Sequence, residues 1–146
     1  MKFAYKKIPI FPHSSYLGIS VLRPIIPAII SYGGNSLKYD VLIDSGADFC
    51  ILPAEIGEYL GIDIKSRTKQ EFGGIQEQGK TRAVAYMHEV ILNIGGYDYK
   101  TTVGFSYDIA KMGYGILGQK GFFNLFKIQF DYRKGEVELK EKPEVN

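Results

Sequence analysis

The sequence contains no tryptophan, one cysteine and no long apolar run. A single cysteine, Cys50, excludes an internal disulfide and favours a reducing compartment, so we expect a cytoplasmic protein. The most apolar stretch, PIIPAII (24–30), contains two prolines and is far shorter than the roughly 20 residues that span a bilayer. The opening segment MKFAYKKIPIFPH is positively charged but lacks a continuous apolar run, so we expect neither a secretory signal nor a membrane partner.

The sequence also lacks a strong charge of either sign. The formal net charge is only +2, and the lysines and arginines are scattered among acidic residues. We therefore expect no nucleic-acid partner, because such proteins usually carry a basic patch. Two histidines and one cysteine, widely spaced, do not form a metal-ligand cluster, so we expect neither a metal nor another cofactor.

The residues that are present indicate a globular β protein. Of the 146 residues, 45% are hydrophobic and 23% are charged, which suits one domain over 1–146 with its core at about 20–140. Valine, isoleucine, threonine and the 11 tyrosines and 9 phenylalanines recur in short runs, which favours strands. The pattern predicts an all-β fold, a closed or nearly closed barrel with two short helices.

The predicted elements follow from alternation and turn residues. The expected strands cover 24–32, 37–44, 49–53, 69–72, 80–94, 97–107, 113–118, 127–132 and 136–140. Prolines in the first of these suggest an edge strand. One helix is predicted over 53–61, with Pro53 in the first position, Gly61 as the C-cap and an apolar stripe of Ile56, Tyr59 and Leu60. A second is predicted over 119–126, although Gly121 weakens it.

The stretch YDVLIDSGADFCILP (39–53) places Asp44 between two apolar runs. A carboxylate buried there costs several kcal/mol unless it is neutralised or hydrogen-bonded. Taken alone, Asp-Ser-Gly is most simply a turn at a strand end. Its neighbours also suit a presented carboxylate: Gly46 admits a close backbone N–H, Ser45 offers a hydroxyl, and Ala47 leaves room for another chain.

Two further segments add to this motif. FGGI (72–75) lies at the tip of a long predicted hairpin, where Gly73 and Gly74 allow a bend and Ile75 follows. GILG (115–118) places Ile116, Leu117 and Gly118 in a short buried strand that leads into the second predicted helix. Each segment by itself is equally well explained as an ordinary turn or core strand.

In this order, the three segments resemble those of the retropepsin-like aspartic proteases, from about Arg23 to Leu139. The resemblance implies a closed barrel with one lobe per chain. It further implies that Asp44, Ser45 and Gly46 form the catalytic motif, with Ser45 linking two catalytic loops. The substrate would contact Ala47, Asp48 and a flap formed by Phe72, Gly73, Gly74 and Ile75, while Ile116, Leu117 and Gly118 would support the site. Gln119 and Lys120 stand where retroviral members often have an arginine.

Aspartic proteolysis needs two carboxyls, and this sequence has one Asp-Ser-Gly motif. Two carboxyls about 3 Å apart cannot both ionise cheaply, so they share a proton and activate one water between them. A C2 homodimer would supply the second Asp44 by symmetry. We therefore expect a homodimeric aspartic endopeptidase that acts on a peptide or protein substrate.

Three other interpretations of the sequence are possible. The segment GYGILG (113–118) fits a dinucleotide motif, but the following sequence lacks the βαβ unit that such a site needs. Cys50 could be a thiol nucleophile, yet its apolar surroundings favour a buried small hydrophobe. The strongest alternative is a dimeric binding or assembly module of the same fold with weak or no proteolytic activity, since function depends on the site rather than the fold.

Overall fold

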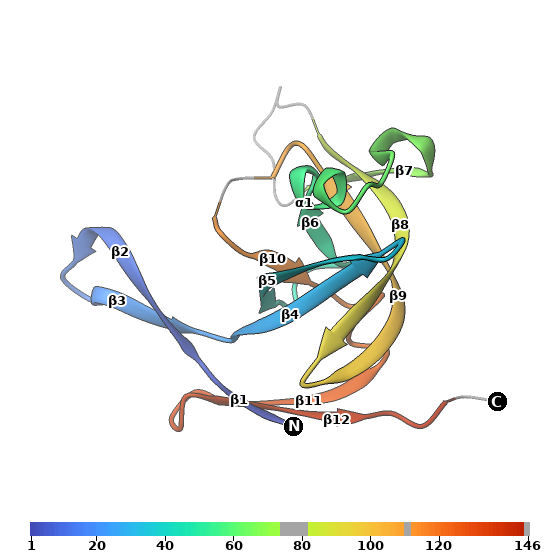
Figure 1. The fold of residues 1–146 in the computed structure, drawn as a ribbon. Coiled ribbons are helices and arrows are strands. Elements are labelled where there is room, and N and C mark those ends of the chain that lie inside the picture. Colours follow the sequence, from blue (N-terminus) through green and yellow to red (C-terminus); the bar gives the residue numbers. More distant parts are fainter. Residues whose placement is uncertain (74–81, 110–111, 145–146) are drawn as a thin grey trace.

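Six strands close into a barrel at the centre of the computed structural model, which describes residues 1–73, 82–109 and 112–144 (Figure 1). The barrel order is β4 (Ile25–Tyr32), β5 (Asn35–Ile43), β10 (Gly115–Leu117), β6 (Ile51–Pro53), β9 (Tyr97–Ser106) and β8 (Ala83–Ile94). Strand β8 pairs back onto β4 and closes the ring, and it also pairs with β7 (Lys69–Phe72). The predicted closed barrel is confirmed.

Alternating side chains fill the barrel. In β4, Ile26, Ala28 and Ile30 are buried, whereas Pro27 and Ile29 between them are exposed. This is the period of two that places one face of a strand on the core. Large buried side chains from all parts of the barrel complete it, among them Val41, Leu52, Leu92, Val103, Phe105 and Leu117.

Strand β4 is not an edge strand, contrary to the prediction from its prolines. It pairs with β5 on one side, and Ile29–Ser31 pair with β8 on the other. Pro27 lies before this second pairing begins, so its missing N–H removes no hydrogen bond from it.

The first predicted helix is present as α1 (Ala54–Tyr59). Pro53 is its N-cap, and Gly61 adopts φ +86°, the left-handed conformation expected after a helix end. The predicted apolar stripe is only partly correct. Leu60 is buried, but Tyr59 is 68% exposed, and Gly57 takes the inward position because a Cβ there would lie 2.5 Å from Ile64 Cδ1.

The second predicted helix, 119–126, is not formed. Turns occupy this segment, and β11 (Phe126–Asp131) begins at its end. Gly121 adopts φ +104°, which no α-helix contains, and a Cβ there would lie 2.8 Å from the carbonyl oxygen of Thr102. The segment is therefore shaped by close packing against β9 rather than by helical propensity. A short 3-10 helix, η1 (Ile64–Ser66), was not predicted.

Two smaller sheets lie outside the barrel. Strand β12 (Glu136–Glu141) pairs with β11, as predicted, and on its other side with β1 (Lys2–Ala4), which was not predicted. Strands β2 (Lys6–Ser14) and β3 (Gly18–Arg23) form a hairpin that extends away from the barrel (Figure 1). Within the described ranges, no helix combines the length and the apolar character needed to cross a membrane.

Candidate active site

Asp44 stands at the end of β5, beside the end of the parallel strand β10. Val41 pairs with Gly115 and Ile43 with Leu117. The Asp44 N–H continues this ladder by donating to the Leu117 carbonyl over 3.0 Å. Parallel strands end at the same edge of a sheet, and this edge is where ligands commonly bind in other sheets. The pairing therefore fixes the backbone of Asp44 at an accessible edge.

The loop after β5 orients the carboxyl group of Asp44. The Gly46 N–H donates to Asp44 Oδ1 over 2.9 Å, and the Ala47 N–H donates to the Asp44 carbonyl over 3.2 Å. No described residue donates to the second oxygen, Oδ2. Asp44 is half-buried rather than deeply buried as the sequence suggested, because it lies where the strand leaves the core.

The segment immediately after β10, Gln119 and Lys120, is hydrogen-bonded to this loop. The Gln119 N–H donates to the Ala47 carbonyl over 2.8 Å, and the Lys120 N–H donates to the Asp48 carbonyl over 2.9 Å. The Gln119 side chain donates from Nε2 to the Ser45 carbonyl over 2.8 Å. These three bonds join the two segments.

Gly118 makes the close approach of the two segments possible. A Cβ at this position would lie 2.3 Å from the Phe49 carbonyl oxygen and 2.7 Å from that of Ala47. Cys50 fills the space directly below, where its sulfur accepts the Gly118 N–H over 3.4 Å. Cys50 is fully buried, and burial raises the pKa of its thiol to about 11. The thiol is therefore protonated and inaccessible, as expected for a packing residue rather than a nucleophile.

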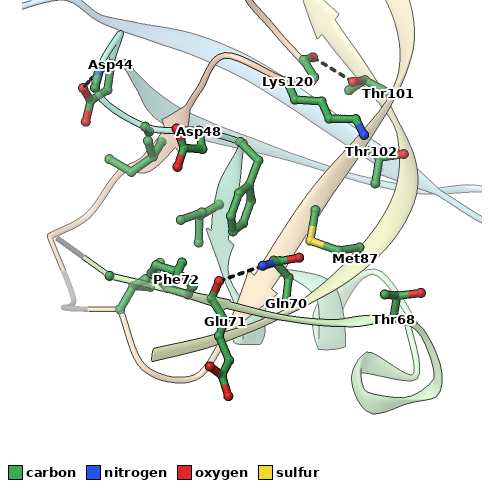
Figure 2. A pocket seen from close by; sticks show the side chains of 18 of the residues that line it. Asp44, Asp48, Thr68, Gln70, Glu71, Phe72, Met87, Thr101, Thr102 and Lys120 are labelled. Carbon is green, nitrogen blue, oxygen red and sulfur yellow. Dashed lines mark hydrogen bonds between the residues drawn. The ribbon is translucent and has the colours of Figure 1, made fainter. Parts of the chain in front are cut away.

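A cavity of about 1060 Å³ opens beside Asp44. Figure 2 shows Asp44 and Asp48 on one side of it and Phe72, Glu71 and Gln70 of β7 on the other. The volume of the cavity is at the upper end of the range of about 300–1,000 Å³ that is usual for ligand sites. Its lining also includes Gly46, Ala47, Phe49, Ile51, Thr68, Gly73, Arg82, Met87, Thr101, Thr102, Ile109, Ile116, Lys120, Gly121 and Asn124.

Most residues singled out from the sequence lie at or beneath this cavity. Seven of them line the cavity, although they come from three separate segments of the chain: Asp44, Gly46, Ala47, Asp48, Phe72, Gly73 and Ile116. Leu117 and Gly118 are buried behind the loop. Ser45 is exposed, outside the cavity lining, and its hydroxyl bonds to no described residue. Gly74 and Ile75 lie outside the described residues.

Several lining residues were missed by the sequence analysis. Phe49 packs its ring edge-on against Phe72, with 5.8 Å between ring centroids, and thereby connects the loop to β7. Its place directly after Asp48 could have indicated this role. Met87 and Thr102 carry no comparable local signal, because only the pairing of β8 and β9 within the barrel brings them to the cavity.

The cavity lining has a mixed charge. Asp44, Asp48 and Glu71 are acidic, and Arg82 and Lys120 are basic. Arg82 Nη1 lies 3.8 Å from Glu71 Oε2 in a largely exposed pair, which contributes little to stability. Among the described residues, no group of three or more histidine, cysteine, aspartate or glutamate side chains could hold a metal ion.

The glycine pattern of residues 113–118 does not form a dinucleotide site. Strand β10 pairs directly with both β5 and β6, and turns rather than a helix follow Gly118. A phosphate-binding motif of this type needs the helix N-terminus that is missing at this point.

Comparisons with known proteins identify solved structures that are similar to this fold. No protein-family model and no curated protein sequence matches the chain. A retropepsin-like aspartic protease from Rickettsia conorii is similar in structure, with a TM-score of 0.53 and 17% identity over 95% of this chain and 92% of that one. The EIAV protease, solved in complex with the inhibitor HBY-793, matches with a TM-score of 0.44 and 24% identity over 66% of this chain and 82% of its own. The chain thus has the retropepsin-like fold that its three motifs predicted.

Proposed function

We propose that the chain is a homodimeric aspartic endopeptidase in which two copies of Asp44 activate one water molecule. One observation carries the proposal. The single Asp-Ser-Gly-Ala motif lies at an open cavity, with one carboxyl oxygen of Asp44 held by the Gly46 N–H and the other without a described partner. A carboxylate oriented in this way is suited to accept a proton from water.

The second carboxyl would come from a second copy of the chain. Among the described residues that line the cavity, Asp48 is the other aspartate, but it belongs to the same loop as Asp44, and no described N–H donates to its carboxyl group. A two-fold axis close to Asp44 would bring the two Asp-Ser-Gly loops together. The exposed Ser45 hydroxyl, which bonds to no described residue, would then lie close enough to link the two loops.

The proposed reaction conserves protons at each step. The ionised Asp44 takes a proton from the water molecule, and the water oxygen attacks the peptide carbonyl carbon. At the same time, the protonated Asp44 of the partner donates its proton to the carbonyl oxygen. In the resulting gem-diol, one hydroxyl gives its proton to the partner's Asp44, which the first step left ionised, and the oxygen of that hydroxyl becomes the carbonyl oxygen of the new carboxylic acid. The peptide C–N bond breaks, and the proton that was taken from water goes to the leaving nitrogen.

The cavity supports a peptide as the substrate. Gly46 and Ala47 present a small surface on which a peptide backbone can lie, and the cavity lining also includes Phe72, at the end of β7, and Gly73. Phe72 and Gly73 would belong to the flap that contacts the substrate. In this proposal each chain forms one catalytic lobe. The location would be cytoplasmic, because the single cysteine, Cys50, is a free thiol.

The test is the cleavage of a peptide library by wild type and by Asp44→Asn. Asparagine keeps the oxygen that accepts the Gly46 N–H but cannot take a proton, so both exchangeable carboxyls of the dimer disappear. We expect cleavage to fall by at least about a thousand-fold, because the general base and the general acid are both lost. We expect the midpoint of thermal unfolding to stay the same or to rise.

Asp63→Asn is the matched control, since Asp63 is exposed and its side chain caps no helix. It should leave cleavage unchanged. Cleavage that survives in Asp44→Asn would exclude the aspartic mechanism. A lower unfolding midpoint in Asp44→Asn, with no cleavage by wild type, would favour the dimeric binding module in which Asp44 only stabilises a turn.

A further inference from the structure

Strands β2 and β3 form an arm, residues 6–23, that stands apart from the barrel (Figure 1). The two strands pair only with each other among the described strands. An isolated two-stranded hairpin is marginally stable in water. At about 3.3 Å per residue, the nine residues of β2 span at most roughly 30 Å, since the pairing of β2 with β3 is irregular between Pro9 and Ser14. The arm is therefore long enough to reach well beyond its own barrel.

The far part of the arm exposes large apolar side chains. Tyr16 is 93% exposed, Phe11 81%, Ile19 63% and Leu17 55%. Single exposed apolar residues are common, but a group of four on one projecting hairpin indicates a contact surface. The barrel of the same chain does not cover them.

The same part of the arm lacks charge. Residues 8–22 include no lysine, arginine, aspartate or glutamate, although 23% of the whole chain is charged. The charged groups stand at the base, where Lys6 pairs with Asp40 and Arg23 Nη1 donates to the Tyr114 hydroxyl over 2.6 Å. The partner of the arm must therefore offer apolar surface rather than phosphate or carboxylate groups.

The base of the arm adjoins the Asp44 loop. Strand β3 ends at Arg23, β4 begins at Ile25, and Ile25 pairs with Leu42 near the end of β5. The Ile43 N–H donates to the Pro24 carbonyl over 3.0 Å, one residue before Asp44. Figure 1 shows the arm leaving the barrel on the side where β5 and β10 end. A two-fold axis at Asp44 would place the second copy on this side.

We infer that the arm of each chain packs its apolar end, Phe11, Tyr16, Leu17 and Ile19, against the second copy and so holds the dimer together. The inference rests on the proposed dimeric function and names the surface that completes it. The arm begins next to the residues that the axis must join, and it points to the side that the second copy would occupy. A lipid surface would also accept apolar side chains, but nothing in that alternative explains why the arm starts beside Asp44.

The first experiment measures the dimer dissociation constant by sedimentation across a dilution series. The arm variant combines Phe11→Ser, Tyr16→Ser and Ile19→Ser. We expect its dissociation constant to rise about a hundred-fold or more, because several buried apolar side chains each contribute roughly ten-fold to association. The monomer should keep its circular dichroism spectrum, since the arm pairs with no strand of the barrel.

Tyr32→Ser combined with Tyr97→Ser is the matched control. Both tyrosines are exposed, 39% and 62%, and they lie next to the β4–β5 and β8–β9 turns rather than on the arm. This variant should dimerise like wild type. An arm variant that dimerises like wild type would overturn the inference, as would equal weakening by the control.

The second experiment locates the contact directly. Cys50 is fully buried, so Leu17→Cys adds the one accessible thiol of the chain. A photo-crosslinker attached there should yield a product of two chains at concentrations where the dimer forms. Crosslinks confined to a single chain would contradict the inference. Flotation with neutral phosphatidylcholine vesicles tests the lipid alternative, and arm-dependent flotation with unchanged dimerisation would favour it instead.

The failure of the arm and the failure of the peptidase are distinguishable. If wild type and the arm variant both dimerise and both cleave peptides, the inference about the arm is wrong and the proposed peptidase activity is supported. If wild type dimerises, the arm variant is monomeric and neither protein cleaves a peptide, the inference about the arm is supported and the proposed peptidase activity is wrong. If both hold, the arm variant should regain cleavage when its concentration exceeds its raised dissociation constant.

Discussion

Asp44 and Gly118 depend on each other through the backbone. Asp44 is placed by the Leu117 carbonyl, and the segment after Leu117 comes close to the loop only because residue 118 has no Cβ. Gly118 does not need glycine for its φ, since its backbone is not in the left-handed region. Its requirement is steric, and the atoms in the way are backbone atoms that cannot rotate aside.

Gly118→Ala should therefore destabilise the protein and misplace Asp44. The added Cβ would lie 2.3 Å from the Phe49 carbonyl oxygen, so we expect a loss of about 1–3 kcal/mol in unfolding free energy. Urea titration measures it. Gly46→Ala is the control, because its Cβ meets only the Asp44 side chain at 3.2 Å, and its loss should be smaller. Equal stability of Gly118→Ala and wild type would show that the close approach is not required.

The raised pKa of the buried Cys50 thiol should lower the stability of the protein at high pH. Burial raises the pKa of its thiol from 9.0 to about 11, so the unfolded chain releases this proton first. Stability is unaffected below pH 9 and falls as the pH rises from about 9 to about 11, by an order of 2 kcal/mol. The measurement is unfolding free energy from pH 8 to 11 for wild type minus Cys50→Ala, in which the tyrosine contributions cancel. A difference that does not change with pH would contradict the prediction.

At the scale of elements, β7 and the Asp44 loop are held together by aromatic packing. Phe49 follows the loop, Phe72 ends β7, and their rings meet at 87°. This arrangement sets the width of the cavity between Asp48 and β7 (Figure 2). The strand that leads toward residues 74–81 is thereby coupled to the candidate catalytic motif.

A double-mutant cycle with Phe49→Leu and Phe72→Leu should measure that coupling. Edge-to-face aromatic pairs contribute about 0.5–1.5 kcal/mol beyond the area that they bury, so the two losses in unfolding free energy should be non-additive by this amount. The control pairs Phe72→Leu with Phe130→Leu, a residue of β11 that is 40% exposed and not paired with Phe72. Additive losses in the first cycle would show that the rings do not couple.

At the scale of the whole molecule, one chain presents one Asp-Ser-Gly-Ala loop and one half of a proposed site. The arm, the loop and the ends of β5 and β10 all meet on one side of the barrel (Figure 1). This placement suits a two-fold assembly, in which each chain offers the same surface to its partner.

Mixing wild type with Asp44→Asn should therefore lower the activity of the wild-type chains. If subunits exchange at random in an equal mixture, roughly one dimer in four has two Asp44 side chains, and the activity of a fixed amount of wild type falls to about half. Peptide cleavage after incubation measures this fall. Asp63→Asn added in the same amount should not cause it. Unchanged wild-type activity under conditions of proven exchange would indicate that one chain acts alone.

Local patterns determined much of the fold and the candidate motif. The strands β4 and β9, the Pro53–Gly61 helix signals and the ordered motifs at Asp44, Phe72 and Ile116 all depend on a few neighbouring residues, and each was predicted. Such features depend on side-chain period, turn chemistry and backbone propensity, which a short stretch of sequence carries by itself.

The tertiary structure alone decided the remaining features. Residues 119–126 form turns instead of the predicted helix because Gly121 packs closely against Thr102 of β9 with a positive φ. Closure of the barrel brought Met87 and Thr102 to the cavity. The arm at 6–23 projects because its pairing stays local while its base is tied to β5. These outcomes depend on contacts between residues far apart in the chain, and strand register sets those contacts.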